Sequence, residues 1–593
     1  MKISQEKHIQ FYNQQIKAEE DEWRKYADSA INILIQEKRL FIGRIWGIQE
    51  NQGNIVLRFK EDQVPRMKQP YFLGVVGVDS SPNPSSWSYS YKTFRESLQP
   101  RYYSGIKADI FTVSYWKTEE NWSYIIVSGF ELDLLNIIKE NYLKNKIHPL
   151  IVVAETDPPV DYLIKLKEFV QKQNDEEVLN LELEVSEDIW EPTNLDNANN
   201  ITSQVIKLVD KQKTTLIQGP PGTGKSYLAA ELCDYYLNQG KSICVTALTN
   251  KALMEIASKK GLQDSLNKNK VYKTNLTGDE QKELPHLQKA ETFSPNQGEL
   301  LLSTYYKLAQ KQANLIEDGE RFDLMIIEEA SQAFLATIAM FSTIALKVII
   351  IGDHKQLTPI AKKMEEAKTI HPKIEGVING LQTFAFNNSE LSFRLTKTRR
   401  LTSDASRLTG IYYSNCLESI SDIEGKTDFK SIYKSLFHNN GGVTIAKLSA
   451  SRSGFKEKEL LNFICQISRE ILKNNPKIEI AVLTPYKDIE SSLYTQYSKL
   501  SNDYKNITIS TVHKIQGLTS DLTILYLPLN LPAFDLNENL FNVASSRAKK
   551  GTLIITYDPI DLVSAASIET KQFIKSCSNV SEEFKEVFVN TLL

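Results

Sequence analysis

The chain has 593 residues, a length that predicts several domains. Of these residues, 41% are hydrophobic and 24% are charged, proportions typical of soluble globular proteins. The formal net charge is −3, so no overall positive field attracts nucleic acid, and such a partner would need a local groove. The five cysteines are scattered without a C-x-x-C pair, which argues against a zinc module or disulfide framework and favours a cytoplasmic location. The sequence has no signal-peptide pattern and no run of roughly 18 apolar residues that would span a membrane.

The first part of the chain combines helical and β-rich patterns. Residues 5–39 carry apolar side chains at spacings of three and four, which predicts a long helix. Between residues 41 and 130, short β-rich runs are separated by turn signals, which predicts a small β-barrel or compact sheet. Residues 161–173 predict a second helix. We therefore expect a β-barrel held between long helices.

An acidic segment separates this region from the remainder. Eight acidic residues and no Lys or Arg lie between Asp175 and Glu191, which predicts a solvated connection before Pro192. Beyond it, apolar runs alternate with helical patterns, which predicts parallel sheets covered on both faces. The predicted strands form two series: 215–217, 243–245, 300–302, 324–327 and 348–351, then 443–446, 480–483, 507–509, 522–526 and 553–555. The fold class is therefore α/β, with domains expected at residues 1–191, 192–380 and 381–593.

One segment matches G-x-x-x-x-G-K-[ST] at every position and lies between a predicted strand and a predicted helix. Its residues are Gly219, Pro220, Pro221, Gly222, Thr223, Gly224, Lys225 and Ser226. Such a loop directs backbone N–H groups at phosphate oxygens from a helix N-terminus. Lys225 would reach the β- and γ-phosphates, and the Ser226 hydroxyl would hold Mg²⁺. The segment predicts binding of a nucleoside triphosphate, with ATP and Mg²⁺ as the expected cofactors.

Polar residues at the ends of other predicted strands extend this site. Glu328 and Glu329 follow strand 324–327, and we assign Glu328 to the metal and Glu329 to the base that activates water. The amide of Gln356, after strand 348–351, can sense the γ-phosphate.

Further strand ends carry small polar residues, and the second α/β unit carries arginines. Thr249, Asn250 and Thr304 suit sugar–phosphate contacts, which carry no sequence information. Arg400 and Arg547 offer rigid donor forks for phosphate oxygens, and an arginine from one domain can stabilise transition-state charge on a phosphate held by another. We therefore expect both arginines to be catalytic.

The order of these motifs resembles that of superfamily 1 helicases, in the branch that contains the nonsense-mediated-decay helicase and its DNA-processing relatives. The resemblance covers roughly residues 195 to 560 and rests on Gln204, on segments 216–219, 328–332, 352–359, 482–486 and 511–517, and on residues 542–549. It implies two tandem RecA-like domains with ATP in their cleft, a single strand across their tops, and an N-terminal barrel on stalk helices. By resemblance, Gln204 reads adenine, Arg399 and Gly517 belong to the nucleotide site, and four residues contact nucleic acid: Thr484, Pro485, Thr511 and His513.

Three residues depart from the family pattern. The metal-binding acid is usually Asp but is Glu328 here, one methylene longer, which predicts slower turnover. Thr519 stands where the family usually has Glu, and Arg399 where close relatives have an aromatic residue that stacks on the base. A guanidinium also stacks on aromatic faces, so we expect Arg399 to substitute for that residue.

Three functions are consistent with these motifs. The first is an ATP-dependent motor that translocates on or unwinds single-stranded RNA or DNA, with 5′-to-3′ movement implied by the resemblance. The second is a nucleotide-gated clamp or sensor that hydrolyses ATP without processive unwinding. The third, a phosphate-loop ATPase unrelated to nucleic acid, fits the ordered motifs poorly. We expect a monomeric motor and leave a protein partner open.

Overall fold

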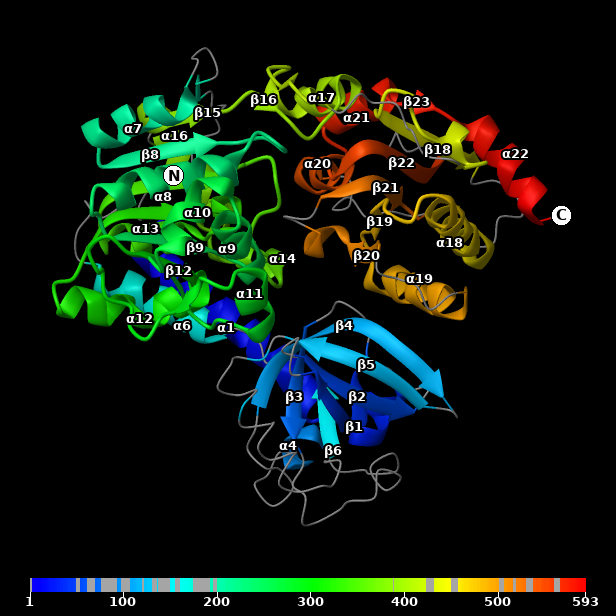
Figure 1. Cartoon of the computed structure of the whole chain (residues 1–593), viewed down its shortest axis with the longest axis horizontal. Coiled ribbons are helices and arrows are strands. Elements are labelled where there is room, and N and C mark those ends of the chain that lie inside the picture. The colour runs from blue at the N-terminus through cyan, green and yellow to red at the C-terminus, as the bar shows by residue number, and fades with distance from the viewer. Residues whose placement is uncertain are drawn as a thin grey trace.

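A computed structural model describes most of the chain, and Figure 1 displays a barrel below two α/β units that lie side by side. The described residues are 3–49, 54–60, 65, 70–75, 93–97, 107–119, 122–128, 130, 136, 150–154, 160–173, 192–195, 200–387, 389–422, 431–449, 457–500, 506–515, 519–528, 537–558 and 566–592. Within these ranges, no helix is both long enough and apolar enough to cross a membrane.

The N-terminal region forms a closed antiparallel barrel with the strand order β1-β2-β5-β4-β3-β6, which is the first of the two predicted forms. Its strands are β1 (Leu40–Gln49), β2 (Asn54–Lys60), β3 (Pro70–Val75), β4 (Lys107–Glu119), β5 (Trp122–Ser128) and β6 (Leu150–Ala154). In β2, Ile55, Leu57 and Phe59 alternate with more exposed residues and fill the interior. The sequence analysis missed β6, which pairs with both β1 and β3 and closes the barrel.

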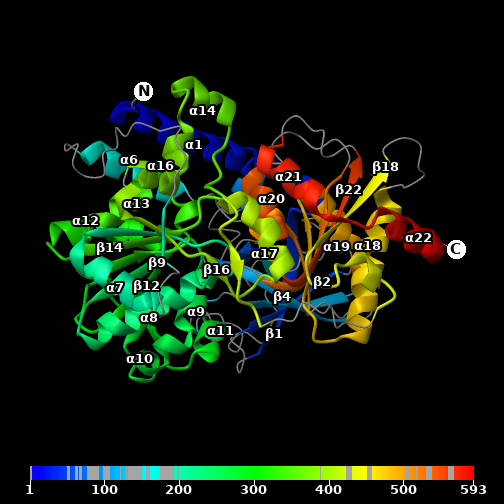
Figure 2. The same cartoon turned by 90° about the horizontal axis from the view of Figure 1, so that it is seen from above.

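Helices on either side of the barrel attach it to the first α/β unit. Helix α1 (Gln5–Ala27) precedes the barrel and α6 (Val160–Lys172) follows it, and they pack against each other. Phe11 of α1 makes an edge-to-face contact with Phe334, at the start of α13 (Leu335–Ser342). In the view of Figure 2, α1 lies along one edge of this unit, near α14 (Met364–Ile370). The helices therefore act as the expected stalk.

The single helix predicted over residues 5–39 is divided in two. Helix α1 ends at Ala27 and α2 spans Ile31–Gln36. Between them, Ala30 takes an extended conformation and pairs with Thr93, just before the short helix α4 (Phe94–Ser97). This non-local pairing ends a helix that the apolar spacing alone would continue.

The first α/β unit contains a nine-stranded sheet in the order β11-β10-β12-β9-β13-β14-β8-β15-β7, and every pairing in it is parallel. Its strands are β7 (Thr193–Asn194), β8 (Thr214–Gln218), β9 (Ile243–Ala247), β10 (Val271–Lys273), β11 (Gln288–Lys289), β12 (Leu300–Thr304), β13 (Phe322–Ile327), β14 (Ala345–Gly352) and β15 (Ser392–Arg394). Within β14, Val348 and Ile350 belong to one hydrophobic core and Ile349 and Ile351 to another. Burial on both faces explains the continuous apolar runs.

Helices cover both faces of this sheet (Figure 1). The helices of this unit are α7 (Ile201–Lys211), α8 (Lys225–Asn238), α9 (Asn250–Ala257), α10 (Gln263–Asn267), α11 (Gly278–Glu283), α12 (Tyr305–Glu317), α13, α14 (Met364–Ile370), α15 (Glu375–Ile378) and α16 (Gly380–Asn387). A short strand pair, β16 (Lys397–Thr398) with β17 (Glu418–Ser419), lies between the two units.

The second unit contains a six-stranded parallel sheet in the order β20-β19-β21-β22-β18-β23. Its strands are β18 (Val443–Ser449), β19 (Ile480–Thr484), β20 (Ile507–Thr511), β21 (Ser520–Tyr526), β22 (Ala548–Asp558) and β23 (Ser578–Asn579), and its helices are α17 (Ser403–Gly410), α18 (Glu457–Asn474), α19 (Lys487–Leu500), α20 (Glu538–Ser545), α21 (Ile568–Ser576) and α22 (Ser581–Leu592). All ten strands predicted for the two sheets are present, and the predicted fold class is confirmed.

The exact domain limits stay a prediction. The first sheet receives β15 from beyond residue 380, because β15 pairs with β8 in parallel. The acidic segment used to place the limit near residue 192 lies outside the described residues from 174 to 191.

Candidate functional site

Three loops of the first unit meet because their strands are neighbours. Strands β13, β14 and β8 lie side by side and run parallel, so their carboxyl ends share one edge of the sheet. The loop after β8 is the glycine-rich segment, the loop after β13 begins with Glu328, and the loop after β14 contains Asp353 and Gln356. Residues far apart in the chain therefore line one site.

The glycine-rich loop has the backbone geometry of an anion cradle. Gly222 and Gly224 have φ angles of +75° and +88°, which side chains with a Cβ rarely adopt. A Cβ on Gly219 would lie 2.3 Å from Lys225 Cγ, so this position also requires glycine. Helix α8 begins at Lys225 directly after the loop and directs its free N–H groups toward the cavity.

Lys225 and Ser226 lie next to the first acidic residue. The Lys225 ammonium donates to the Gly219 carbonyl, and burial lowers its pKa while Asp353 and Glu328 oppose that shift. The Ser226 hydroxyl hydrogen-bonds the Glu328 carboxylate. A hydroxyl and a carboxylate in contact form an oxygen donor set that suits Mg²⁺, so these two residues fit the expected metal.

Glu329 is held in a strained position beside Glu328. Its φ of +54° lies in the left-handed region, which a non-glycine residue occupies at an energetic cost and which is frequent at functional sites. Burial, followed by the charge of Glu328, raises the pKa of the Glu329 carboxyl. The Thr249 hydroxyl donates to Glu329 at 3.4 Å. A carboxyl with a raised pKa is a better proton acceptor, as the role of base requires.

The segment that lies between the two units contacts the glycine-rich loop directly. The Thr398 hydroxyl donates to the Pro221 carbonyl at 2.9 Å, and the Arg399 backbone N–H donates to the Gly222 carbonyl at 2.9 Å. Arg547 is buried, and burial together with the charge of Arg400 lowers its pKa. Arginine remains protonated in proteins, so two guanidinium groups lie close together here, with Asp353 and Glu329 also acting on Arg547. Their combined charge favours an anionic ligand beside the phosphate cradle.

Together these residues enclose a cavity of about 420 Å³ between the two units. The cavity is lined by Pro221, Gly222, Thr223, Gly224, Lys225, Ser226, Tyr227, Ala252, Glu255, Lys259, Glu328, Glu329, Ser331, Gly352, Asp353, Gln356, Arg399, Arg400, Thr519, Arg547 and Lys549. Eleven of the predicted nucleotide-site and catalytic residues are in this lining, and they come from both units. The volume, the amide cradle and the arginines fit a nucleoside triphosphate.

Four predicted residues are not in the lining. Gly219 and Pro220 form the start of the cradle, and the Pro220 carbonyl accepts from the Thr223 hydroxyl at 2.8 Å. Gln204 lies on α7, partly buried, and its backbone N–H donates to the Asn200 carbonyl. Gly517 lies outside the described residues. The assignment of Gln204 and Gly517 to the nucleotide stays a prediction.

The residues predicted to contact nucleic acid gather at two pairs of adjacent strand ends. Thr249 and Asn250 follow β9 and are exposed, and Thr304 ends the neighbouring strand β12. In the second unit, Thr484 ends β19 and Thr511 ends β20, which are also adjacent. Pro485, directly after Thr484, and His513, two residues after Thr511, are partly buried. Thr304, Thr484 and Thr511 are buried, so Thr249 and Asn250 are the most accessible of the set.

Several residues of the site were missed by the sequence analysis. Tyr227, directly after Ser226, lines the cavity with 50% of its surface exposed, and an aromatic residue adjoining the motif was its signal. Asp353, at the end of β14, is buried in the cavity wall. Lys273 is fully buried and donates to Asn250 Oδ1 at 2.8 Å, while it pairs with Glu280 at 3.0 Å. A lysine in a short strand carries no sequence signal for such a supporting role.

Comparisons with known proteins agree with this geometry. Two family models, each described as an AAA domain, match residues 202–371 and 388–558. The chain is 26% identical over 434 residues to the ATP-dependent helicase upf1 of Schizosaccharomyces pombe, covering 61% of this chain and 45% of that protein. It is 23% identical over 427 residues to the DNA replication ATP-dependent helicase/nuclease DNA2 of Saccharomyces cerevisiae, covering 66% of this chain and 27% of that protein.

Among solved structures, a complex of Arterivirus nonstructural protein 10 (helicase) with DNA matches at 16% identity and a TM-score of 0.33, covering 61% of this chain and 64% of that one. The chain spans less than half the length of the two curated relatives described above.

The fold and the site define a nucleotide-binding protein with a phosphate loop and a cavity shared by two α/β units. The two AAA-domain models match in tandem across these units, and together with the similarity to upf1 and DNA2 they support a superfamily 1 helicase of the Upf1-like branch.

Proposed function

We propose that the protein is an ATP-dependent motor that moves on, or unwinds, a single-stranded nucleic acid. The cavity between the two α/β units carries the argument, because ATP bound there would contact Lys225 on one unit and Arg547 on the other. Binding of ATP then favours closure of the units, and hydrolysis and release favour opening. Alternating closure converts turnover into movement when both units also contact the strand.

The chain's own residues supply each step of the proposed hydrolysis. Lys225 and the amides of the cradle bind and orient the phosphates, while Arg400 and Arg547 stabilise the charge that develops. Glu329 accepts a proton from the attacking water, and Gln356 orients that water or the γ-phosphate. Ser226 and Glu328 are the residues that would hold Mg²⁺, which when bound neutralises phosphate charge.

The strand would cross the carboxyl ends of β9 and β12 in one unit and of β19 and β20 in the other. Thr249 and Asn250 offer polar groups suited to sugar and phosphate, which fits binding without sequence preference. Lys273 supports a role of Asn250 in strand binding, because the fully buried Lys273 side chain donates a hydrogen bond to Asn250 Oδ1 and holds that side chain in place. Location in the cytoplasm and action as a monomer are part of the same proposal, and the free cysteines are consistent with the former.

Besides Arg399, which also lines the cavity, Tyr227 is a candidate for stacking on the nucleotide base. Its exposed ring lies at the cavity, and Lys259 lies over it with Nζ 5.0 Å from the ring centroid. Tyr227→Ala will raise the KM for ATP roughly five- to ten-fold and change kcat little, because stacking on a base contributes about 1–3 kcal/mol to binding. Steady-state kinetics will measure this, with Tyr227→Phe as the matched control that keeps the ring. An unchanged KM in the alanine variant would exclude the stacking role.

A clamp or sensor is the second candidate function. Glu328 in place of the usual Asp favours slow turnover, and Thr519 in place of the usual Glu weakens a ribose or coupling contact. Both residues line the cavity. Such a protein would grip nucleic acid according to the bound nucleotide and signal to a partner without displacing a strand. Strand displacement therefore separates the clamp from the motor.

The first test is the steady-state ATPase rate without nucleic acid, with single-stranded RNA and with single-stranded DNA. Stimulation of about ten-fold or more by one polymer is the expected result, and Glu329→Gln should remove the stimulated rate, because a lost catalytic base costs about 10²–10⁴-fold. Absence of stimulation by both polymers would count against the motor and the clamp alike.

Where one polymer stimulates turnover, that polymer is then used for strand displacement from duplexes with a 5′ or a 3′ single-stranded tail. Displacement from the 5′-tailed duplex alone is the expected result for the motor. Stimulated turnover without displacement from either duplex would favour the clamp.

A further inference from the structure

The loop after β14, residues 353–357, is held by the second α/β unit as well as by its own. Leu357 belongs to the hydrophobic core of the second unit, and it is packed there with Tyr412 and Tyr413. Lys355 forms an ion pair with Glu538 of α20, with Nζ and Oε1 2.9 Å apart. This loop also lines the nucleotide cavity through Asp353 and Gln356, so it contacts the proposed ligand site on one side and the second unit on the other.

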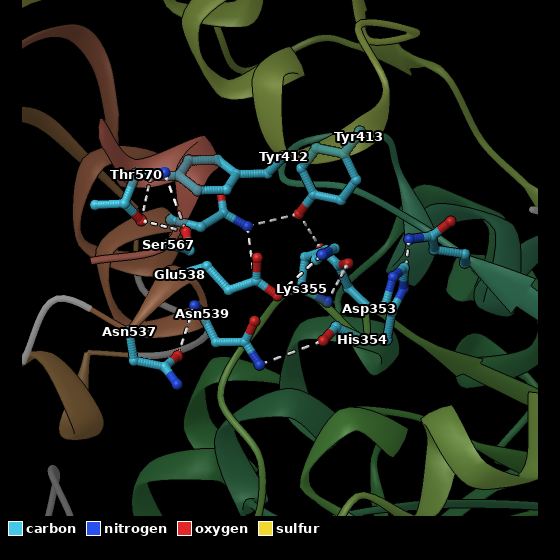
Figure 3. A network of polar contacts seen from close by, with 12 residues as sticks. Asp353, His354, Lys355, Tyr412, Tyr413, Asn537, Glu538, Asn539, Ser567 and Thr570 are labelled. Atoms are coloured by element: carbon cyan, nitrogen blue, oxygen red, sulfur yellow. Dashed lines mark hydrogen bonds and ion pairs between the residues drawn. The ribbon is translucent and has the colours of Figure 1, made fainter. Parts of the chain in front are cut away.

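Tyr413 is at the centre of these contacts (Figure 3). Its hydroxyl donates to Asp353 Oδ2 at 2.6 Å and accepts a hydrogen bond from Asn542 Nδ2 at 2.8 Å. All three side chains are buried, Tyr413 with 2% of its surface exposed and Asp353 with 1%. Hydrogen bonds that involve a buried carboxylate are strong, and losing one partner leaves a costly unpaired group.

The contacts of Tyr413 lead through Asp353 to Gln356 in the first unit and through α20 to Arg547 in the second. Asp353 Oδ2 also accepts from Gln356 Nε2 at 2.9 Å, so the carboxylate that Tyr413 binds also positions the amide that faces the cavity. On the other side, Asn542 Nδ2 donates to the Lys355 carbonyl at 2.7 Å. Next to Asn542 in α20, the Val543 carbonyl accepts from Arg547 Nε at 2.8 Å. Burial and the charge of Asp353 raise the pKa of Tyr413, so its hydroxyl remains a donor.

We propose that Tyr413 is a positioning residue that locks the 353–357 loop to helix α20 and thereby aligns Gln356 of one unit with Arg547 of the other on the same phosphate. This inference rests on the proposed function and deepens it, because it explains how domain closure and catalysis become one event. Tyr413 itself does not line the cavity. Its loss should therefore affect the alignment of catalytic groups far more than ground-state binding of ATP.

Tyr412 provides a matched control one position away. It is also buried, with 3% of its surface exposed, but its hydroxyl contacts Thr570 of α21 at 3.5 Å, within the second unit. Figure 3 displays the two hydroxyl groups with separate partners. Tyr412→Phe and Tyr413→Phe remove the same atom from the same core, and only the second removes a contact between the units.

The test compares wild type, Tyr412→Phe and Tyr413→Phe in nucleic-acid-stimulated ATP hydrolysis. Tyr413→Phe should lower kcat about ten-fold and leave the KM for ATP within about two-fold, since it removes two hydrogen bonds that align catalytic groups. Tyr412→Phe should retain the wild-type values. Wild-type turnover in Tyr413→Phe, or an equal loss in both variants, would overturn the positioning role while leaving the proposed function intact.

A second measurement does not depend on activity. Hydrogen exchange should become faster in peptides covering residues 353–357 and 538–545 for Tyr413→Phe, and for Tyr412→Phe only in peptides near residue 570. If wild type shows no stimulated turnover, the proposed function fails, and exchange alone then decides the inference. Unchanged exchange at residues 353–357 in Tyr413→Phe would overturn it.

Discussion

Lys225→Ala will abolish ATP hydrolysis and weaken nucleotide binding. Lys225 is half-buried at the start of α8, and its ammonium lies close enough to Asp353 and Glu328 for their charges to affect its pKa. Removing it takes away the cation that would bind the β- and γ-phosphates and leaves these acids facing the phosphate charge. We expect turnover to fall by at least about 10³-fold, comparable to losses at sites of electrostatic stabilisation.

The measurement pairs steady-state ATP hydrolysis with equilibrium binding of a fluorescent ATP analogue. Lys213→Ala is the matched control, because Lys213 is an exposed lysine next to the amino end of β8, at the opposite end of the strand from the cavity. This control should retain wild-type hydrolysis and binding. Turnover retained by Lys225→Ala would refute the assignment of the phosphate site.

Arg547→Ala will lower turnover by about 10³-fold or more while nucleotide binding stays within a few-fold of wild type. Arg547 comes from the second unit and lines a cavity whose phosphate cradle belongs to the first. An arginine supplied across such a boundary acts mainly on the charge of the transition state, for which losses of about 10³–10⁵-fold in kcat are typical. The KM for ATP should therefore change much less than kcat.

Two variants separate this role from a structural one. Arg547→Lys keeps the charge but loses the planar fork, so it should recover only part of the turnover. Arg407→Ala removes an arginine from α17 in the same unit whose side chain is 68% exposed, and it should leave turnover unchanged. Loss of ATP binding together with a large drop in Tm in Arg547→Ala would mean that Arg547 supports the fold instead.

The two predictions concern opposite sides of one cavity, and together they test whether catalysis requires both units. Lys225 lies on the first unit with the acids Glu328 and Glu329, and Arg547 follows α20 on the second. The hydrogen bonds of Tyr413 join these sides through Asp353 and Asn542. A motor needs this connection, since nucleotide chemistry does work only if it changes how the two units hold each other.

Local pattern predicted much of the fold and the core of the site. Continuous apolar runs such as 348–351 indicated buried parallel strands because both faces of each sheet are covered. The glycine-rich loop was recognisable because its chemistry depends on consecutive residues, with Gly222 and Gly224 at positive φ and Lys225 starting the helix. The sequence by itself thus determined the class of fold, the phosphate cradle and the acids at the strand ends.

Only the tertiary structure decided which distant segments these elements contact. Three features depend on pairing between distant segments. They are the closure of the barrel by β6, the break between α1 and α2, and the contact of Lys273 with Asn250. The same holds for Tyr413, which reads from sequence as an ordinary core residue. Periodicity reports which side of an element is buried, but it carries no information about which distant atom a buried hydroxyl meets, and in this protein that partner is the Asp353 carboxylate of the other unit.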